Sequence, residues 1–252
     1  TQSYGGTTAL INASLGEDAN NGIAAALGYP AGTKISRDQW NGYHVPNEYV
    51  ANFDLVGVDW EATSGFGYNR EKSDRRAFFY NIGGVEAYDK ANVNSGWRCW
   101  KFNSRASDGT LYSTDNYSIF SSADFPMFRL AEMYLIYAEA QARLDGGTTT
   151  DSKAMGYIKE LRDRAGMTTP SSINLDFILK ERACELMWEG HRRTDLIRYG
   201  YFTAMSFPWP YKGGIPDGKV ALPSYRTVYP LLQSDLSENS NLVQNTGYQS
   251  NN

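Results

Sequence analysis

The stretch from Phe128 to Gly200 reads FRLAEMYLIYAEAQARLDGGTTTDSKAMGYIKELRDRAGMTTPSSINLDFILKERACELMWEGHRRTDLIRYG. Apolar residues recur in it at helical spacing, in three runs that turn-forming residues separate. The runs predict helices at about 126–144 and 151–165, and a third helix from Asn174 to about Gly190. A shorter helical segment follows at 191–199, and the rest of the chain is expected to form loops and short strands against these helices.

Each predicted helix carries its own end signals. The Gly146-Gly147 pair ends the first helix, and Gly166 is the stop of the second. Asn174 is a good N-cap for the third helix, and Asp176 lies in its first turn, where the helix dipole favours a negative charge. The helix ends are therefore expected to follow from local sequence.

The first helix is small or apolar on two faces, one led by Leu130 and Tyr134 and the other by Leu135 and Ala138, so we expect it to be packed on two sides. Two helices joined by a short Gly-rich turn and followed by a third are typical of a helical-repeat array. No second copy of the pair occurs in the chain, so further repeats would lie upstream. This pattern favours a fragment of a longer protein.

Length and charge limit the possible classes of protein. The 252 residues are enough for one large domain or two small ones, with a real core. The net charge is -4 and no basic run occurs, which argues against nucleic acid as a partner. No apolar run approaches the roughly 18 to 20 residues of a membrane span, and no signal segment opens the chain at Thr1.

Aromatic residues are unusually frequent, at 14% of the chain, and several lie in Gly- and Pro-rich segments. Flat rings in such loops suit sugars, whose C–H faces stack on rings while their hydroxyls bond to polar side chains. The alternative is that each ring only holds its loop against the helices. The predicted ligand-binding residues are Tyr29, Trp40, Tyr43 and Trp60.

Short elements are also predicted between these rings and the helices. A helix is expected at 47–53, after Pro46, and only a weak helical run is found nearer the N-terminus, at 22–27. The aromatic runs RAFFYNI (76–82) and GWRCWKF (96–102) predict two short strands, which could pair as a hairpin with a long connection.

The charged third helix is the first place to look for catalysis. Glu181, Glu185 and Glu189 repeat every four residues and would share one face, about 6 Å apart. Glu185 and Glu189 could thus form a glycosidase pair. Arginines at neighbouring positions would instead hold these carboxylates ionised, whereas a general acid needs a raised pKa. We therefore interpret the charges as an ion-pair network that fastens the helix to its neighbours.

The sequence gives only weak indications of a metal site or of a reactive thiol. Asp54, Asp59 and Glu61 could supply oxygen ligands to a structural calcium ion, or they could be solvated loop acids. The two histidines and two cysteines are far apart, so no zinc site and no other cofactor are predicted. Cys99 and Cys184 could be two buried free thiols or one disulfide.

Three segments, in this order, resemble the C-terminal region of the SusD/RagB family. They are DFPMFRLAEMYLIYAEA (124–140), IKELRDRAG (158–166) and ILKERACELMWEGHRRTDLIR (178–198). The ending also resembles the family's closing pattern, with YPLL (229–232) followed by NSNLVQNTGY (239–248).

The segments WNGYHVPNEYVANFD (40–54) and DRR (74–76) are similar to the family's sequence before that region. The resemblance spans roughly residues 40 to 248. It implies a mainly α fold, built of tetratricopeptide-like helix pairs in an α/α superhelix, with long loops and a few short β-strands. Residues 1–252 would form a single domain, and the N-terminal half of the family would be missing.

The resemblance also implies a non-enzymatic lipoprotein on the surface of the outer membrane of Bacteroidetes-type bacteria. Such a protein captures glycans, as in starch and polysaccharide utilisation, and passes them to a SusC-like TonB-dependent transporter. Membrane contact would be made only through an upstream lipid anchor. No ligand contact transfers by motif, because the family's binding residues vary, so the four loop rings remain the site hypothesis.

Three functions therefore remain open from sequence. The leading hypothesis is a glycan-binding protein that is not an enzyme, although a peptide ligand is not excluded. The alternatives are a glycosidase that uses Glu185 and Glu189, and a helical-repeat adaptor that binds a peptide of another protein. Rings on a concave helical face, rather than on loops, would favour the adaptor.

Overall fold

The computed structural model describes residues 7–36, 38–81, 96–105, 110 and 123–249. The chain divides into two compact units, Thr1–Glu189, which we call the N-terminal unit, and Gly190–Asn252, the C-terminal unit. The prediction that residues 1–252 form one domain stays a prediction.

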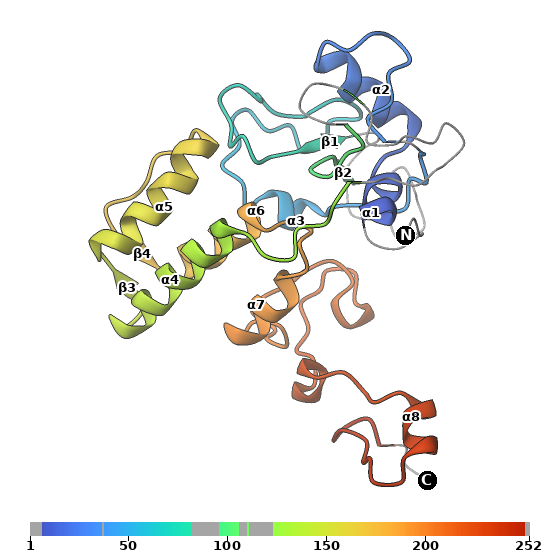
Figure 1. Ribbon diagram of the computed structural model, residues 1–252, viewed down its shortest axis with the longest axis vertical. Helices are drawn as coiled ribbons and strands as arrows, with labels where there is room; N and C mark the ends of the chain where they lie inside the picture. The colour runs from blue at the N-terminus through green and yellow to red at the C-terminus, as the bar shows by residue number, and fades with distance from the viewer. Residues whose placement is uncertain (1–6, 37, 82–95, 106–109, 111–122, 250–252) are drawn as a thin grey trace. The chain divides into compact units, whose positions relative to one another are not determined.

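Three helices form one half of the N-terminal unit: α4 (Leu130–Leu144), α5 (Ser152–Ala165) and α6 (Leu175–Glu185). Helix α4 packs against both α5 and α6 (Figure 1). The apolar positions of the helical period meet in one core, as the sequence predicts. The core residues include Leu135, Ala138, Ala142, Ile158, Leu161 and Ile178.

The predicted end signals at Gly166 and Asn174 are confirmed, and Asp151 supplies a cap that was not predicted. The Asp151 carboxylate accepts hydrogen bonds from the backbone N–H groups of Lys153 and Ala154, which caps α5, and Gly166 ends that helix at a φ of 74°. Asn174 Oδ1 accepts from the backbone N–H of Phe177, at 2.8 Å, and caps α6. Two short strands that were not predicted, β3 (Thr148–Thr149) and β4 (Ile173–Asn174), pair antiparallel between the helices.

Two predicted helix ends are wrong. Helix α4 begins at Leu130 rather than near 126, because Arg129 has an extended backbone with φ −149° and ψ 156°. Helix α6 ends at Glu185 rather than Gly190. The Glu185 carbonyl accepts hydrogen bonds from Lys101 Nζ and Arg129 Nη2, at 2.8 and 2.6 Å. These side chains replace the backbone N–H donor that a further helical turn would supply.

The two apolar faces of α4 are not packed equally. The face with Leu135 and Ala138 is buried in the core. On the other face, the rings of Tyr134 and Tyr137 contact Tyr157 of α5, but Leu130 is 63% exposed. Two-sided packing is therefore confirmed for only part of the helix, because α5 meets this face through the two tyrosines.

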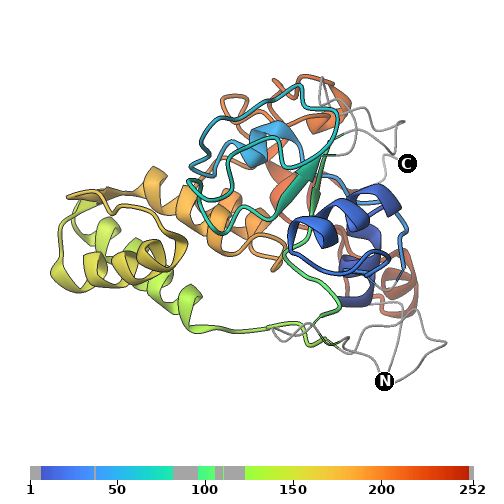
Figure 2. The same ribbon diagram turned by 90° about the horizontal axis from the view of Figure 1, so that it is seen from above.

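A hairpin forms the centre of the other half of the N-terminal unit. Strands β1 (Phe79–Asn81) and β2 (Trp97–Cys99) pair antiparallel, with Asn81 opposite Trp97. The predicted hairpin is confirmed, although both strands are shorter than expected, and its connection at 82–95 lies outside the described residues. Helix α3 (Asn47–Val50) starts directly after Pro46, as predicted, and lies beside the hairpin (Figure 2).

One apolar cluster joins the hairpin, α3 and the end of α6. It includes Val45, Val50, Phe53, Phe79, Trp97, Cys99, Cys184 and Met187. Both cysteines are buried free thiols, so the first of the two interpretations of Cys99 and Cys184 is confirmed. Burial raises the pKa of the Cys99 thiol to about 12, which keeps it protonated and unreactive.

Two helices precede this part of the chain, α1 (Thr7–Ser14) and α2 (Glu17–Ala26). The sequence predicted only the 22–27 part of α2 and missed α1. Helix α2 packs against β1 over a second apolar cluster. The cluster consists of Leu15, Ala19, Ile23, Ala24, Ile35 and Trp100.

The C-terminal unit has short elements only: helices α7 (Arg192–Arg198) and α8 (Gln233–Glu238), and the 3-10 helices η1 (Lys212–Gly214) and η2 (Ser224–Thr227). Lys212 is buried, and its Nζ donates to the carbonyls of Ala204 and Phe207. Among the described residues, no helix combines the length and the apolar character that crossing a bilayer requires.

Candidate functional site

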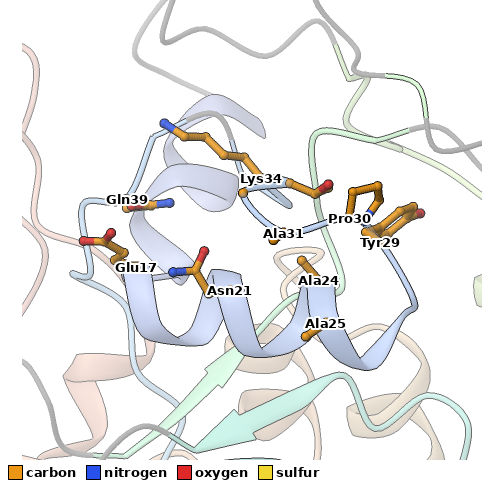
Figure 3. Close-up of a pocket in the computed structure, with 11 residues that line it drawn as sticks. Glu17, Asn21, Ala24, Ala25, Tyr29, Pro30, Ala31, Lys34 and Gln39 are labelled. Atoms are coloured by element: carbon orange, nitrogen blue, oxygen red, sulfur yellow. The ribbon is translucent and has the colours of Figure 1, made fainter.

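A pocket of about 670 Å³ lies between α2 and the loop that follows it, and we call it the Tyr29 pocket. Its polar lining residues are Glu17, Asn21, Thr33, Lys34 and Gln39. In Figure 3, Tyr29 and Pro30 lie at one end of the pocket, Glu17 and Gln39 lie at the other, and Lys34 lies opposite α2. The pocket therefore combines one aromatic ring with carboxylate, amide and ammonium groups.

The local sequence of α2 explains the hollow. Glu17 and Asn21 are four residues apart and lie on one face of the helix, followed by the small side chains of Ala24 and Ala25. After α2 ends, Gly28 takes a φ of 77°, which turns the chain back over the helix. Small residues on both sides thus leave space between two backbone segments.

Arg105 holds the loop of the Tyr29 pocket in place. Its guanidinium lies 5.3 Å from the centre of the Tyr29 ring, and its Nε donates to the Lys34 carbonyl at 2.7 Å. The backbone N–H of Tyr29 also donates to the Ala24 carbonyl, at 3.0 Å. These contacts fix the ring relative to α2, so the pocket is formed before any ligand arrives.

The other three predicted rings also lie in loops or turns, each partly exposed. Trp40 directly follows Gln39 of the pocket, and its Nε1–H donates to Asp38 Oδ2 at 2.7 Å. The Tyr43 ring meets Trp188 edge to face at 6.1 Å. Their role in binding stays a prediction.

Trp60 differs from the rings near the pocket because it is attached to the hairpin. Its ring meets that of Trp97 edge to face, with the ring centres 6.2 Å apart. Part of the Trp60 surface remains in solvent. It is thus both a support for the core and an exposed ring available to a ligand.

The predicted ion-pair network is confirmed, and it joins α6 and Glu189, which follows this helix, to other parts of the N-terminal unit. Arg76 binds Asp74 and Glu181, with Nη1 2.9 Å from Glu181 Oε2. Arg129 binds both Glu185 and Glu189, at 2.7 and 2.6 Å. Further pairs join Lys101 to Glu189, Arg162 to Glu181 and Arg164 to Glu185.

These contacts argue against the glycosidase alternative. Burial alone would raise the pKa of Glu185, but the hydrogen bond from Arg129 and the charges of Arg164 and Arg76 lower the pKa below its ordinary value of 4.5. A general acid must keep its proton near neutral pH, so the shift has the wrong direction for that role. The carboxylate of Glu189 is also buried against Arg129 and Lys101.

Two of the three acids considered for calcium, Asp54 and Asp59, are engaged in other contacts. Asp54 pairs with Lys180 and Arg162, at 2.8 and 3.1 Å. Asp59 Oδ1 accepts from the backbone N–H of Glu61. In the part of the chain that the structure describes, no group of three or more His, Cys, Asp or Glu is placed to hold a metal ion. A calcium site stays a prediction without geometric support.

Fold and site together define a mainly helical protein with a preformed pocket among its N-terminal loops and with buried carboxylates that serve the fold. The chain belongs to the SusD family, whose sequence profile matches residues 36–248. The predicted family membership is thereby confirmed. The match begins after Tyr29 and Lys34, so only Gln39 of the polar pocket residues lies within it.

Two curated relatives show how much of a family member the chain represents. It is 36% identical to the starch-binding protein SusD of Bacteroides thetaiotaomicron over 180 residues, which are 69% of this chain and 31% of that protein. It is 34% identical to a SusD-like protein of Formosa agariphila over 133 residues, 48% of this chain and 24% of the relative. The chain thus spans about a third or less of these relatives.

A solved structure supports the fold independently. The surface glycan-binding protein A from Bacteroides uniformis matches with a TM-score of 0.57 over 86% of this chain and 43% of its own, at 20% identity. Together with the helices described above, this likeness confirms the predicted mainly α, SusD-like fold with a few short strands.

Proposed function

We propose that this chain is part of a cell-surface glycan-binding protein and that the Tyr29 pocket holds sugar residues of the ligand. The observation that carries the proposal is the combination, in one preformed pocket, of an aromatic ring with amide and charged side chains. The curated relative from Bacteroides thetaiotaomicron is named for starch binding, which supports a glycan as the ligand. The names of the reported relatives describe binding and no reaction, in agreement with the prediction that the chain is not an enzyme.

Sugar binding follows from the chemistry of the lining. A pyranose has an apolar C–H face that can lie against the Tyr29 ring and hydroxyl groups that both donate and accept hydrogen bonds. Asn21 and Gln39 each offer a donor and an acceptor, Glu17 accepts and Lys34 donates. A hydroxyl-rich ligand can therefore be met on several sides, whereas a purely apolar ligand would leave these groups without partners.

We expect Tyr29→Ala to weaken binding of this chain to its glycan about tenfold or more, because the stacking surface is lost. Isothermal titration with maltoheptaose, and then with a panel of plant and host polysaccharides, measures the change. Tyr29→Phe keeps the ring and should retain most of the affinity. Tyr229→Ala, an exposed ring in the C-terminal unit, is the matched control and should bind as the unaltered chain does.

Two results would contradict the proposed pocket. One is a glycan that binds Tyr29→Ala as tightly as the unaltered chain, with both showing the same melting temperature. The other is the absence of binding across the whole panel. Trp40→Ala and Trp60→Ala, measured beside Tyr29→Ala, would assign the site to the other predicted rings if they alone lose affinity.

Handover of the glycan is also part of this proposal. Family membership supports a lipid-anchored place on the outer membrane and a TonB-dependent, SusC-like transporter as the partner. Affinity purification of the tagged, full-length parent protein from detergent-solubilised outer membranes should recover a transporter barrel. Purification of the parent without such a barrel would remove this part of the proposal and leave glycan binding untouched.

A further inference from the structure

A smaller pocket, of about 210 Å³, lies over the ion-pair network, and we call it the Arg129 pocket. Two phenylalanines, Phe78 and Phe102, form part of its wall. The charged residues of the lining are Arg76, Lys101, Arg129, Arg164, Glu185 and Glu189. This pocket shares no residue with the Tyr29 pocket.

The charges around the Arg129 pocket do not balance. The charges of Arg76 and Arg162 are met by the buried carboxylates of Asp74 and Glu181, neither of which lines the pocket. Arg76 Nη1 also lies 3.5 Å from Glu185 Oε2. The other lining cations are Lys101, Arg129 and Arg164, and they face the two carboxylates of Glu185 and Glu189. Three cations against two anions leave one positive charge in excess.

The excess charge is accessible at Arg164. Its side chain is 58% exposed, and its Nη2 donates to Glu185 Oε1. A guanidinium carries five N–H donors in a planar fork that matches a carboxylate or a sulfate, so a fork with one hydrogen bond can receive a second anion. Arg129, in contrast, already donates four hydrogen bonds to Glu185 and Glu189.

The walls of the Arg129 pocket favour a sugar as the carrier of that anion. Phe102 stacks on Phe125 with ring centres 5.7 Å apart, and both Phe78 and Phe102 are only partly buried. An aromatic wall beside a cation suits the C–H face and the acidic substituent of one charged sugar ring. Glu185 is also paired to Arg129, at 2.7 Å, so Arg164 is not the sole partner of that carboxylate.

We propose that the Arg129 pocket binds the carboxylate or sulfate group of an acidic sugar, with Arg164 as the residue that meets the anion. The anion site stands on the charges described here, and the choice of a sugar rests on the proposed glycan-binding function. The inference adds a class of ligand, the acidic glycans, which the Tyr29 pocket does not select.

The test uses the full 252-residue chain and isothermal titration with oligogalacturonate, a sulfated oligosaccharide and neutral maltoheptaose. We expect Arg164→Gln to weaken binding of one or both acidic ligands about tenfold or more, with no effect on maltoheptaose. Arg164→Lys, which keeps the charge but not the fork, should show a smaller loss. Affinity for the acidic ligand should also fall as salt is raised.

Lys159→Gln is the matched control, because it removes one exposed positive charge from the same helix, where Lys159 pairs with Asp163. It should leave acidic binding unchanged. The proposal is overturned if Lys159→Gln weakens binding as much as Arg164→Gln, if Arg164→Gln binds like the unaltered chain, or if a triglutamate peptide binds as well as the acidic sugar. Failure of the Tyr29 pocket would appear separately, as Tyr29-independent binding of maltoheptaose.

Discussion

Replacing Arg76 by Met should lower the free energy of unfolding of the N-terminal unit by about 3–5 kcal/mol, the usual cost of breaking a buried ion pair. Arg76 is 7% exposed, and its guanidinium holds Asp74 through Nε and Nη2 and Glu181 through Nη1. Met fills similar space but leaves Asp74 without this partner in a dry environment. Glu181 keeps its ion pair with Arg162.

Urea unfolding followed by far-ultraviolet circular dichroism measures this loss. Lys159→Met is the control, since it breaks an exposed i,i+4 pair with Asp163 and should cost no more than about 0.5 kcal/mol. Equal stability of Arg76→Met and the unaltered chain would show that the buried pairs contribute no net stability. Domains are stable by about 5–15 kcal/mol, so the expected loss is a large part of the total.

Trp97→Ala should cost a similar amount, about 3–5 kcal/mol, because a large buried ring leaves a cavity. Trp97 is fully buried, and its ring contacts those of Phe79, Tyr68 and Trp60. Its Nε1–H donates to Asn47 Oδ1 at 2.7 Å, which ties β2 to the start of α3. The substitution thus removes packing and a hydrogen bond together.

Trp60→Ala is the informative comparison for Trp97→Ala. Trp60 is 37% exposed and touches the same cluster from outside, so its loss should cost only about 0.5–1.5 kcal/mol, the range of one aromatic pair. The free energies of unfolding of both variants, measured in parallel by chemical denaturation, distinguish a core ring from a surface ring. If Trp60→Ala were as destabilising as Trp97→Ala, Trp60 would be a core residue and a weaker candidate for ligand contact.

The helices of Phe128–Gly200 could be predicted because their signals are local. The caps at Gly166 and Asn174 act on backbone groups within a few residues, so sequence spacing alone locates them. The end of α6 could not be predicted in this way, because Lys101 and Arg129 reach it from distant segments. Helix α1 was missed because its sequence, TTALINAS, has no acidic first turn and no basic last turn.

The network shows the same limit. From the sequence we predicted that arginines keep the glutamates of α6 ionised. We expected these arginines at neighbouring positions of the same helix. The arginines that pair with Glu185 are Arg76, Arg129 and Arg164, all from outside α6. Charge type is readable from sequence, whereas the identity of a partner depends on tertiary packing.

Only some residues of the candidate pocket could be predicted from the sequence. Tyr29 was found because a ring in a Gly- and Pro-rich loop has few places to be buried. Glu17 and Asn21 were missed because α2 was expected to begin at 22. The acidic pair Glu17-Asp18 after Gly16 is the signal that could have placed the helix start, and with it the polar face.

The ion pairs of α6 and of Glu189, which follows this helix, also bear on how the chain folds. Arg129 and Glu185 are separated by 56 residues, Lys101 and Glu189 by 88, and Arg76 and Glu181 by 105. Helices α4 to α6 can assemble from segments that are neighbours in the sequence. Each of these ion pairs instead requires the closure of a long loop, and the chain loses the conformational entropy of that loop before the pair can form. We therefore expect attachment of the hairpin half to the helices to be the slower step of folding, during which Trp97 and its apolar neighbours are exposed to aggregation.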